Sequence, residues 1–330
     1  MGDMIQLRGE KPVVDVTIVS EGAREVVFTR AGDRTTVASK DVVALRHGDT
    51  PGELDHAFRR MEKGDFRATE KLLEPLEARE GWVRAHAGFH RANARRLRAE
   101  LEAAGHDEAL ALLKAWRERE GEHFLAPLAA LVTGDAALVA GNHDLARTEF
   151  TRLGTYGEHV SLSSRLGLAR VKLATSKDPA EALAELETIE NDALVPGDME
   201  AILLSRISRA VALGKKGSAR TGIELLEPLI DTPGMLASPW NGAVLNTVAE
   251  LVADLAGRTP DGAAKPEARV AALPYINRAV RYASAQPVER ARTLALAVEA
   301  NELAGRHDVA ALAKTELARR FPTSVYVKSR

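Results

Sequence analysis

Residues Gly141 to Asp144 read Gly-Asn-His-Asp, so three consecutive side chains could bind a metal ion. A Gly-Asp pair, Gly134 and Asp135, ends six residues earlier. Amide, imidazole and carboxylate groups together suit a pair of divalent cations, which can activate water for the hydrolysis of phosphate esters. The stretch therefore raises the hypothesis of a metal-dependent phosphohydrolase.

The rest of the chain lacks the other parts of such a site. The stretch resembles a motif of the dinuclear metallophosphoesterases, which also use an upstream Asp-x-His, a Gly-Asp-x-x-Asp and a βαβ alternation. Here Asp135 is followed by Ala136, Ala137 and Leu138, and no Asp-x-His precedes it. Gly141 and Asn142 are typical of one helix end and the next helix start. We therefore keep the phosphohydrolase as a remote alternative and predict no enzyme, no catalytic residue, no metal and no cofactor.

His86 and His90 lie four residues apart in a predicted helix, which is the spacing of a metal-binding helix. The residues between them are Ala, Gly and Phe, with no glutamate to act as a base. We therefore predict that both are neutral histidines in a groove or a core. The chain has no cysteine, so thiolate metal sites and disulfides are excluded.

Four arginines in the same predicted helix form a stripe. Their offsets of 0, 7, 11 and 14 residues fall within about 60° of the helix circumference. Such a stripe could bind an acidic peptide through bidentate pairs with carboxylates. The alternative is a solvated face paired with glutamates such as Glu100 and Glu102, or with a neighbouring repeat. The stripe consists of Arg84, Arg91, Arg95 and Arg98.

The N-terminal fifty residues have the pattern of β-strands. In one of them Val14, Val16 and Ile18 alternate with polar residues, which predicts one buried and one wet face. Five short strands with tight turns predict a small SH3-like or Sm-like barrel at 1–50, which packs against the next part of the chain. The predicted strands are Met4–Leu7, Val13–Val19, Glu25–Arg30, Arg34–Ala38 and Val42–Arg46.

From residue 51 to 330 the apolar period becomes that of helices, interrupted by a recurring turn signal. Each signal ends one helix with Gly or Lys and starts the next with Asp, Asn, Ser or Pro. The intervals are about 36 to 47 residues if one further hairpin lies near residue 258. This spacing predicts an α-solenoid of about seven αα-hairpins. The signals begin at Gly64, Gly105, Gly141, Lys177, Lys216 and Gly305.

The segments GDFRATEKLLEPLE, from Gly64, and GSARTGIELLEPLI, from Gly217, are near-copies of each other. With these turns, the chain resembles the tetratricopeptide-repeat family. First-helix consensus aromatics are mostly absent and the intervals exceed 34 residues, so a mixed helical solenoid stays open. The resemblance implies repeat-packing roles for Gly64, Gly134, Gly141, Ala146, Phe150, Gly217, Gly305, Ala310 and Pro322.

The resemblance, of a bacterial type, implies a scaffold whose first helices line a concave groove that binds a peptide or protein segment. A self-assembling structural protein is the alternative. The net charge of −2 indicates no general attraction to nucleic acid. No apolar run is long enough to span a membrane. We expect a soluble protein, cytoplasmic as the sequence is written, or periplasmic or secreted if a signal peptide was removed.

Overall fold

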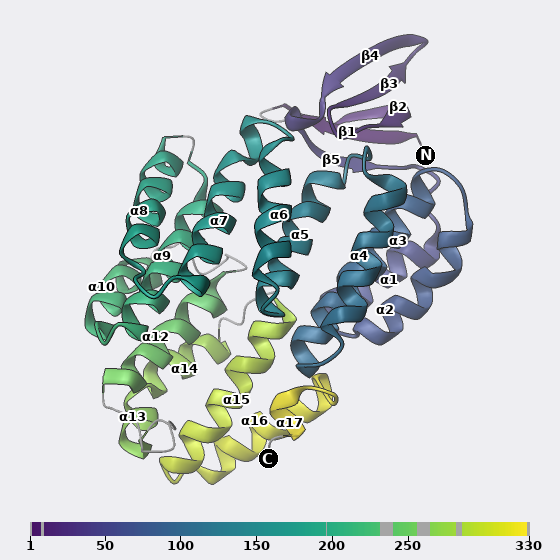
Figure 1. Cartoon of the computed structure of the whole chain (residues 1–330). Helices are drawn as coiled ribbons and strands as arrows, with labels where there is room; N and C mark the ends of the chain where they lie inside the picture. The colour runs from purple at the N-terminus through teal and green to yellow at the C-terminus, as the bar shows by residue number, and fades with distance from the viewer. Residues whose placement is uncertain are drawn as a thin grey trace. The chain divides into compact units, whose positions relative to one another are not determined.

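The computed structural model describes residues 2–7, 10–195, 197–231, 240–255, 265–281 and 286–328. It is mainly helical and begins with a five-stranded antiparallel sheet (Figure 1), which confirms the predicted fold class. The chain forms two compact units. The first holds the sheet and the helices up to Val171, and the second runs from Lys172 onward with the short segments 62–64 and 101–103. The domain boundary at residue 50 stays a prediction.

The sheet has the strand order β4-β3-β2-β1-β5, so the last strand returns to pair with the first. Apolar side chains from all five strands form its core, joined by Phe124 from the helical part of the same unit. The strands are β1 (Asp3–Leu7), β2 (Val13–Glu21), β3 (Glu25–Arg30), β4 (Asp33–Ala38) and β5 (Val42–Arg46), with a 3-10 turn at Ser39–Asp41 before β5.

The predicted alternation of β2 is wrong at its first residues. Val16 is buried as expected, but Val14 is 51% exposed. The register shifts between Asp3 and Met4, which pair with Val16 and Val14 and leave Asp15 out of the ladder at a positive φ of 56°. This bulge turns Val14 to the solvent-exposed face of the sheet, because one extra residue reverses the side-chain alternation.

The helices of the first unit end and begin at the predicted turn signals. Phe89, Trp116 and Ala129, from three consecutive helices, share one buried cluster. The helices are α1 (Gly52–Glu62), α2 (Phe66–Leu73), a 3-10 segment (Glu74–Ala78), α3 (Trp82–Glu102), α4 (His106–Glu120), α5 (Ala126–Val139), α6 (His143–Gly154) and α7 (Ser161–Thr175).

In the second unit most helices pack on those next to them along the chain, and α14 packs mainly on α12 and α15 (Figure 1). The turn predicted near residue 258 lies outside the described residues, but the helices before and after it pack together. The helices are α8 (Ala180–Leu194), α9 (Met199–Lys215), α10 (Ala219–Ile230), α12 (Asn241–Leu255), α13 (Pro266–Ala271), α14 (Leu273–Arg281), α15 (Pro287–Leu303), α16 (His307–Arg320) and α17 (Val325–Lys328).

The two near-copy segments fold differently around their shared proline. Pro75 lies in the 3-10 segment that comes after α2, whereas Pro228 lies inside α10. A proline lacks the N–H that an α-helix uses, so both arrangements omit one backbone hydrogen bond. Among the described helices, none has the length and apolar character that a bilayer crossing requires.

Candidate functional site

Two adjoining cavities lie on the first helices of successive hairpins in the second unit. The larger has a volume of about 480 Å³ and is lined from α9, α12 and α15, with the turn before α10. The smaller, of about 340 Å³, shares Glu250 and Arg292 with it and extends to Arg269 and Tyr326. We call the two together the first-helix groove. The larger cavity is lined by residues that include Val211, Lys215, Thr247, Glu250, Asp254 and Arg292.

Small residues let these helices approach each other closely. A Cβ added at Gly214 of α9 would lie 2.5 Å from Cδ2 of Leu251 in α12, and one at Gly222 of α10 would lie 2.9 Å from the carbonyl oxygen of Ala210. A side chain at Gly222 would meet backbone and force α10 away from α9, whereas one at Gly214 would require the Leu251 side chain to move. The sequence thus builds the groove from closely packed helices whose polar residues face the opening.

The groove carries charges of both signs. Arg269 donates to Glu250 over 3.0 Å and to Glu299 over 3.1 Å. Burial lowers the pKa of Arg269, but the two carboxylates raise it more, so this arginine stays charged. Arg292 is about one-third exposed and lies 3.7 Å from a carboxylate oxygen of Glu289. The arrangement suits a polar segment that carries both acidic and basic groups.

The four arginines of the predicted stripe all lie on α3, a first helix of the first unit. Each is already paired with carboxylates of that unit. Glu100, predicted as a partner of the stripe, pairs with Arg96 instead. An acidic ligand would therefore compete with resident glutamates, and its binding here stays a prediction. The pairs are Arg84 with Glu120, Arg91 with Glu74 and Glu77, Arg95 with Glu70 and Glu108, and Arg98 with Glu70.

The Gly-Asn-His-Asp stretch lies at a helix boundary. Gly141 has a φ of 75°, and the side-chain oxygen of Asn142 accepts the backbone N–H of Leu145 over 3.2 Å, which caps α6. Asp144 pairs with Arg147 on the surface, while Asp135 pairs with Arg170. Within the described ranges, the clusters of His, Asp and Glu that are tight enough for a metal contain none of these residues.

The residues assigned to repeat packing lie at turns and close helix contacts. A Cβ added at Gly134 would lie 2.6 Å from the ring of Phe150, which is fully buried. Gly167 of α7 lies against the same ring, so glycines from two helices make room for it. The others are Gly64, Gly217 and Gly305, each with a positive φ, Ala146 and Ala310, both buried, and Pro322, exposed after α16.

His90 lies in the core of the first unit, edge-on to Phe58 and Phe89, and its Nδ1 atom is buried without a hydrogen-bond partner in the described chain. Burial lowers its pKa to about 3, and the neighbouring His86 adds to this effect. This agrees with the neutral histidine predicted from the sequence. His86, in contrast, lies beside the carboxylate of Glu21.

Because the folded state of His90 has the lower pKa, the unfolded chain binds more protons below pH 6.5. The contribution of His90 to the free energy of unfolding is therefore complete above pH 6.5 and is lost as the pH falls towards 3. We expect His90 to account for a loss of about 2 kcal/mol between pH 7 and pH 5. Urea denaturation at both values should show a smaller loss in His90→Leu. An equal loss in both proteins would contradict the prediction.

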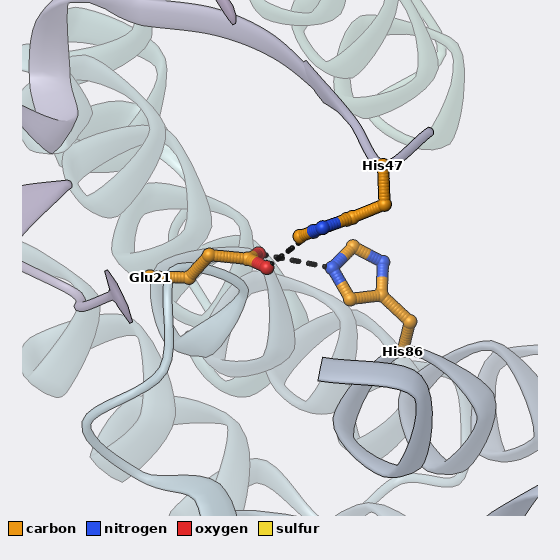
Figure 2. Close-up of side chains that lie close together, drawn as sticks. All are labelled: Glu21, His47 and His86. Atoms are coloured by element: carbon orange, nitrogen blue, oxygen red, sulfur yellow. Dashed lines mark hydrogen bonds and ion pairs between the residues drawn. The ribbon is translucent and has the colours of Figure 1, made fainter. Parts of the chain in front are cut away.

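A second cluster gathers Glu21, His47 and His86 in the first unit (Figure 2). His47 Nε2 lies 2.6 Å from Oε1 of Glu21, and His86 Nε2 lies 3.1 Å from Oε2. Burial raises the pKa of Glu21, but the hydrogen bonds from His47 and His86 lower it more, to about 2. Glu21 is therefore an ionised carboxylate held between two imidazoles.

The end of β2 positions this cluster. The carbonyl oxygen of Glu21 accepts the N–H of Phe124 over 3.0 Å, and Gly22 forms a β-bridge with His123. The loop between α4 and α5 thus continues the sheet and brings His123 to 3.6 Å from the Glu21 carboxylate. His47 comes directly after β5 and stacks on Trp82 of α3 at 3.8 Å, one helical turn before His86.

Sequence reasoning missed Glu21, His47 and His123. They are separated by 26 and 76 residues, and no periodic pattern joins a strand end, a strand exit and a helix turn. The available signal was the pair Trp82 and His86 at the start of a helix. The relevant partners of His86 come from the sheet, not from His90.

The sequence matches no protein-family model and no curated relative. Among solved structures, the chain is similar to NprR in complex with its cognate peptide NprX, at 10% identity and a TM-score of 0.43, covering 85% of this chain and 82% of that one. It is also similar to the apo form of the quorum sensor NprR from B. thuringiensis, at 10% identity, a TM-score of 0.42, and coverages of 82% and 75%. Such low identities and TM-scores do not support a conclusion about function.

Proposed function

We propose that the chain is a non-enzymatic interaction scaffold, which holds a peptide or protein segment in the first-helix groove. The observation that supports this function is the pair of adjoining cavities along α9, α12 and α15. A groove on packed helices can take an extended or helical segment without moving the helices themselves. The hairpin array provides the rigid support that such recognition needs.

The lining indicates a ligand with charges of both signs. Arg292 and Lys215 could bind carboxylates, while Glu250 and Asp254 could bind basic side chains or backbone N–H groups. Thr247, on the same wall, donates its hydroxyl to the carbonyl of Ala243 over 2.7 Å and keeps lone pairs for a donor. We therefore expect a polar segment of mixed charge to bind more strongly than a uniformly acidic one.

Three finer expectations belong to the same proposal. The stripe of Arg84, Arg91, Arg95 and Arg98 is a second candidate contact for acidic residues of a partner. The return of β5 to β1 is compatible with the SH3-like or Sm-like barrel predicted for residues 1–50. Self-association stays an alternative, and light scattering over a concentration series tests it.

A charge reversal in the groove tests the proposal. Peptides would be selected on the intact protein from a random displayed library, and their affinities measured by calorimetry. Arg292→Glu places a third carboxylate near Glu250 and Glu289, so we expect binding at least about tenfold weaker, or about 1.4 kcal/mol. Arg220→Glu, on the exposed side of α10, is the matched control and should leave affinity unchanged.

Two results would contradict the proposed function. The library could yield no peptide that binds above background, or Arg292→Glu could bind the selected peptides as tightly as Arg220→Glu. Circular dichroism of both variants establishes that they are folded before their affinities are compared.

A further inference from the structure

The carboxylate of Glu21 is buried without a permanent cation. Its side chain is 4% exposed, and its charged or hydrogen-bonding partners within the described chain are the imidazoles of His47, His86 and His123, with no lysine or arginine among them. A buried carboxylate is strongly unfavourable unless a cation compensates it.

We propose that Glu21, His47 and His86 bind a divalent transition-metal ion, for which Zn²⁺ is the best fit. The ligand atoms of these residues lie within 4.8 Å of one another. In a tetrahedral zinc site, bonds of about 2.0 to 2.1 Å place ligand atoms roughly 3.3 Å apart. The two nitrogens already lie 2.6 and 3.1 Å from the carboxylate oxygens that they face, so small side-chain rotations complete the geometry.

The donor types select the metal. Two imidazole nitrogens and one carboxylate oxygen form a set that zinc uses in proteins. Ca²⁺ and Mg²⁺ prefer all-oxygen sites and would gain little from two imidazoles. The ion would also supply the positive charge that the Glu21 carboxylate lacks.

An outer layer holds the ligand His47 in place. Its Nδ1 faces an oxygen of Asp3 at 3.9 Å, and its ring stacks on Trp82. The Asp3 carboxylate is itself fixed by the backbone N–H groups of Ile18, at 2.7 Å, and Gly48, at 2.8 Å. At 3.9 Å this contact is longer than a hydrogen bond, and an approach of about 1 Å would let Nδ1–H donate to Asp3. A carboxylate bonded in this way behind a metal-bound imidazole is the usual support of a zinc ligand.

His123 has a different role from the three ligands. Its Nδ1 accepts the backbone N–H of Leu125 over 3.1 Å, so in the neutral ring Nε2 carries the proton. This Nε2 is buried, has no hydrogen-bond partner in the described chain, and lies 3.6 Å from Glu21. It can donate to a water molecule on the ion but cannot bind the ion itself. With three protein ligands, a tetrahedral zinc ion would have its fourth position left for a water molecule.

The ion would join the sheet to the helices. Glu21 ends β2, His47 comes directly after β5 and His86 lies on α3, so one bound ion connects three segments of the first unit (Figure 2). This role is separate from the first-helix groove, whose residues belong to the other unit. We therefore expect zinc to raise the thermal stability of the protein.

Zinc titration of the full chain tests this inference. After treatment with a chelator and dialysis, calorimetry should show one Zn²⁺ bound per chain, with a higher melting temperature, and no binding of Mg²⁺ or Ca²⁺. His47→Gln and His86→Gln should each weaken zinc binding at least about a hundredfold. Asp3→Asn keeps all three ligands and should weaken it about 10- to 100-fold. His143→Gln, in the Gly-Asn-His-Asp stretch, is the matched control and should bind zinc normally.

X-ray absorption spectroscopy of the zinc-loaded natural protein gives a readout that does not depend on how the variants fold. The spectrum should show nitrogen and oxygen ligands, with the scattering pattern of about two imidazoles. Absence of zinc binding, unchanged affinity in His86→Gln, or a spectrum without imidazole scattering would each overturn the inference.

Discussion

Replacing Gly167 with leucine is expected to destabilise the first unit by about 3 kcal/mol or more. A Cβ at this position would lie far inside van der Waals contact with the ring of Phe150. That ring is fully buried and also lies close to Gly134 of α5, so it has no free space to move into. The added side chain must separate α7 from α6, because the packed ring cannot yield.

Urea denaturation measures this loss, and two further proteins identify its cause. Gly52→Ala is the control, since nothing lies within 4 Å of the added atom, and we expect a change within about 0.5 kcal/mol. In Gly167→Ala the loss should be smaller than with leucine, and the second change Phe150→Leu should recover part of it. If Gly167→Leu unfolds at the same urea concentration as the natural protein, the close contact is not present.

The second large loss of stability is expected when Arg117 is replaced. The side chain of Glu149 is completely buried, and Arg117 is its ion-pair partner. Arg117→Met leaves this carboxylate in the core without a cation, which costs about 3 to 5 kcal/mol. Most of that cost comes from stranding the charge, because the pair itself contributes little net stability.

A double variant separates these two contributions. Arg117→Met with Glu149→Leu replaces both charges by apolar groups, and should recover most of the lost stability. Arg147→Met is the matched control, because its partner Asp144 is exposed, and should cost about 0 to 1 kcal/mol. A loss as small in Arg117→Met as in Arg147→Met would show that Glu149 reaches solvent.

The helix boundaries could be predicted because their chemistry is local. Gly141 ends a helix at a positive φ and Asn142 caps the next with its own side chain, so four neighbouring residues contain the whole signal. The same local logic predicted the strands of the sheet. It did not predict the bulge at Asp15, which depends on how β1 pairs with β2.

The side-chain partners could not be predicted, because they come from distant segments. The helical period placed Arg91 and Arg95 on one stripe, but it could not show that Glu70 and Glu77 face them. Similarly, the groove depends on polar residues that α9, α12 and α15 each contribute, and each helix alone looks like an ordinary amphipathic one.

We expect a ligand segment to lie along the first helices of the second unit. A photoreactive amino acid at Val211, which is 40% exposed in the groove, should cross-link to a selected peptide. The same group at Leu312, which is 72% exposed on α16 and does not line the groove, should give no cross-link. Cross-linking at Leu312 and none at Val211 would contradict the claim, since the ligand would then bind outside the groove.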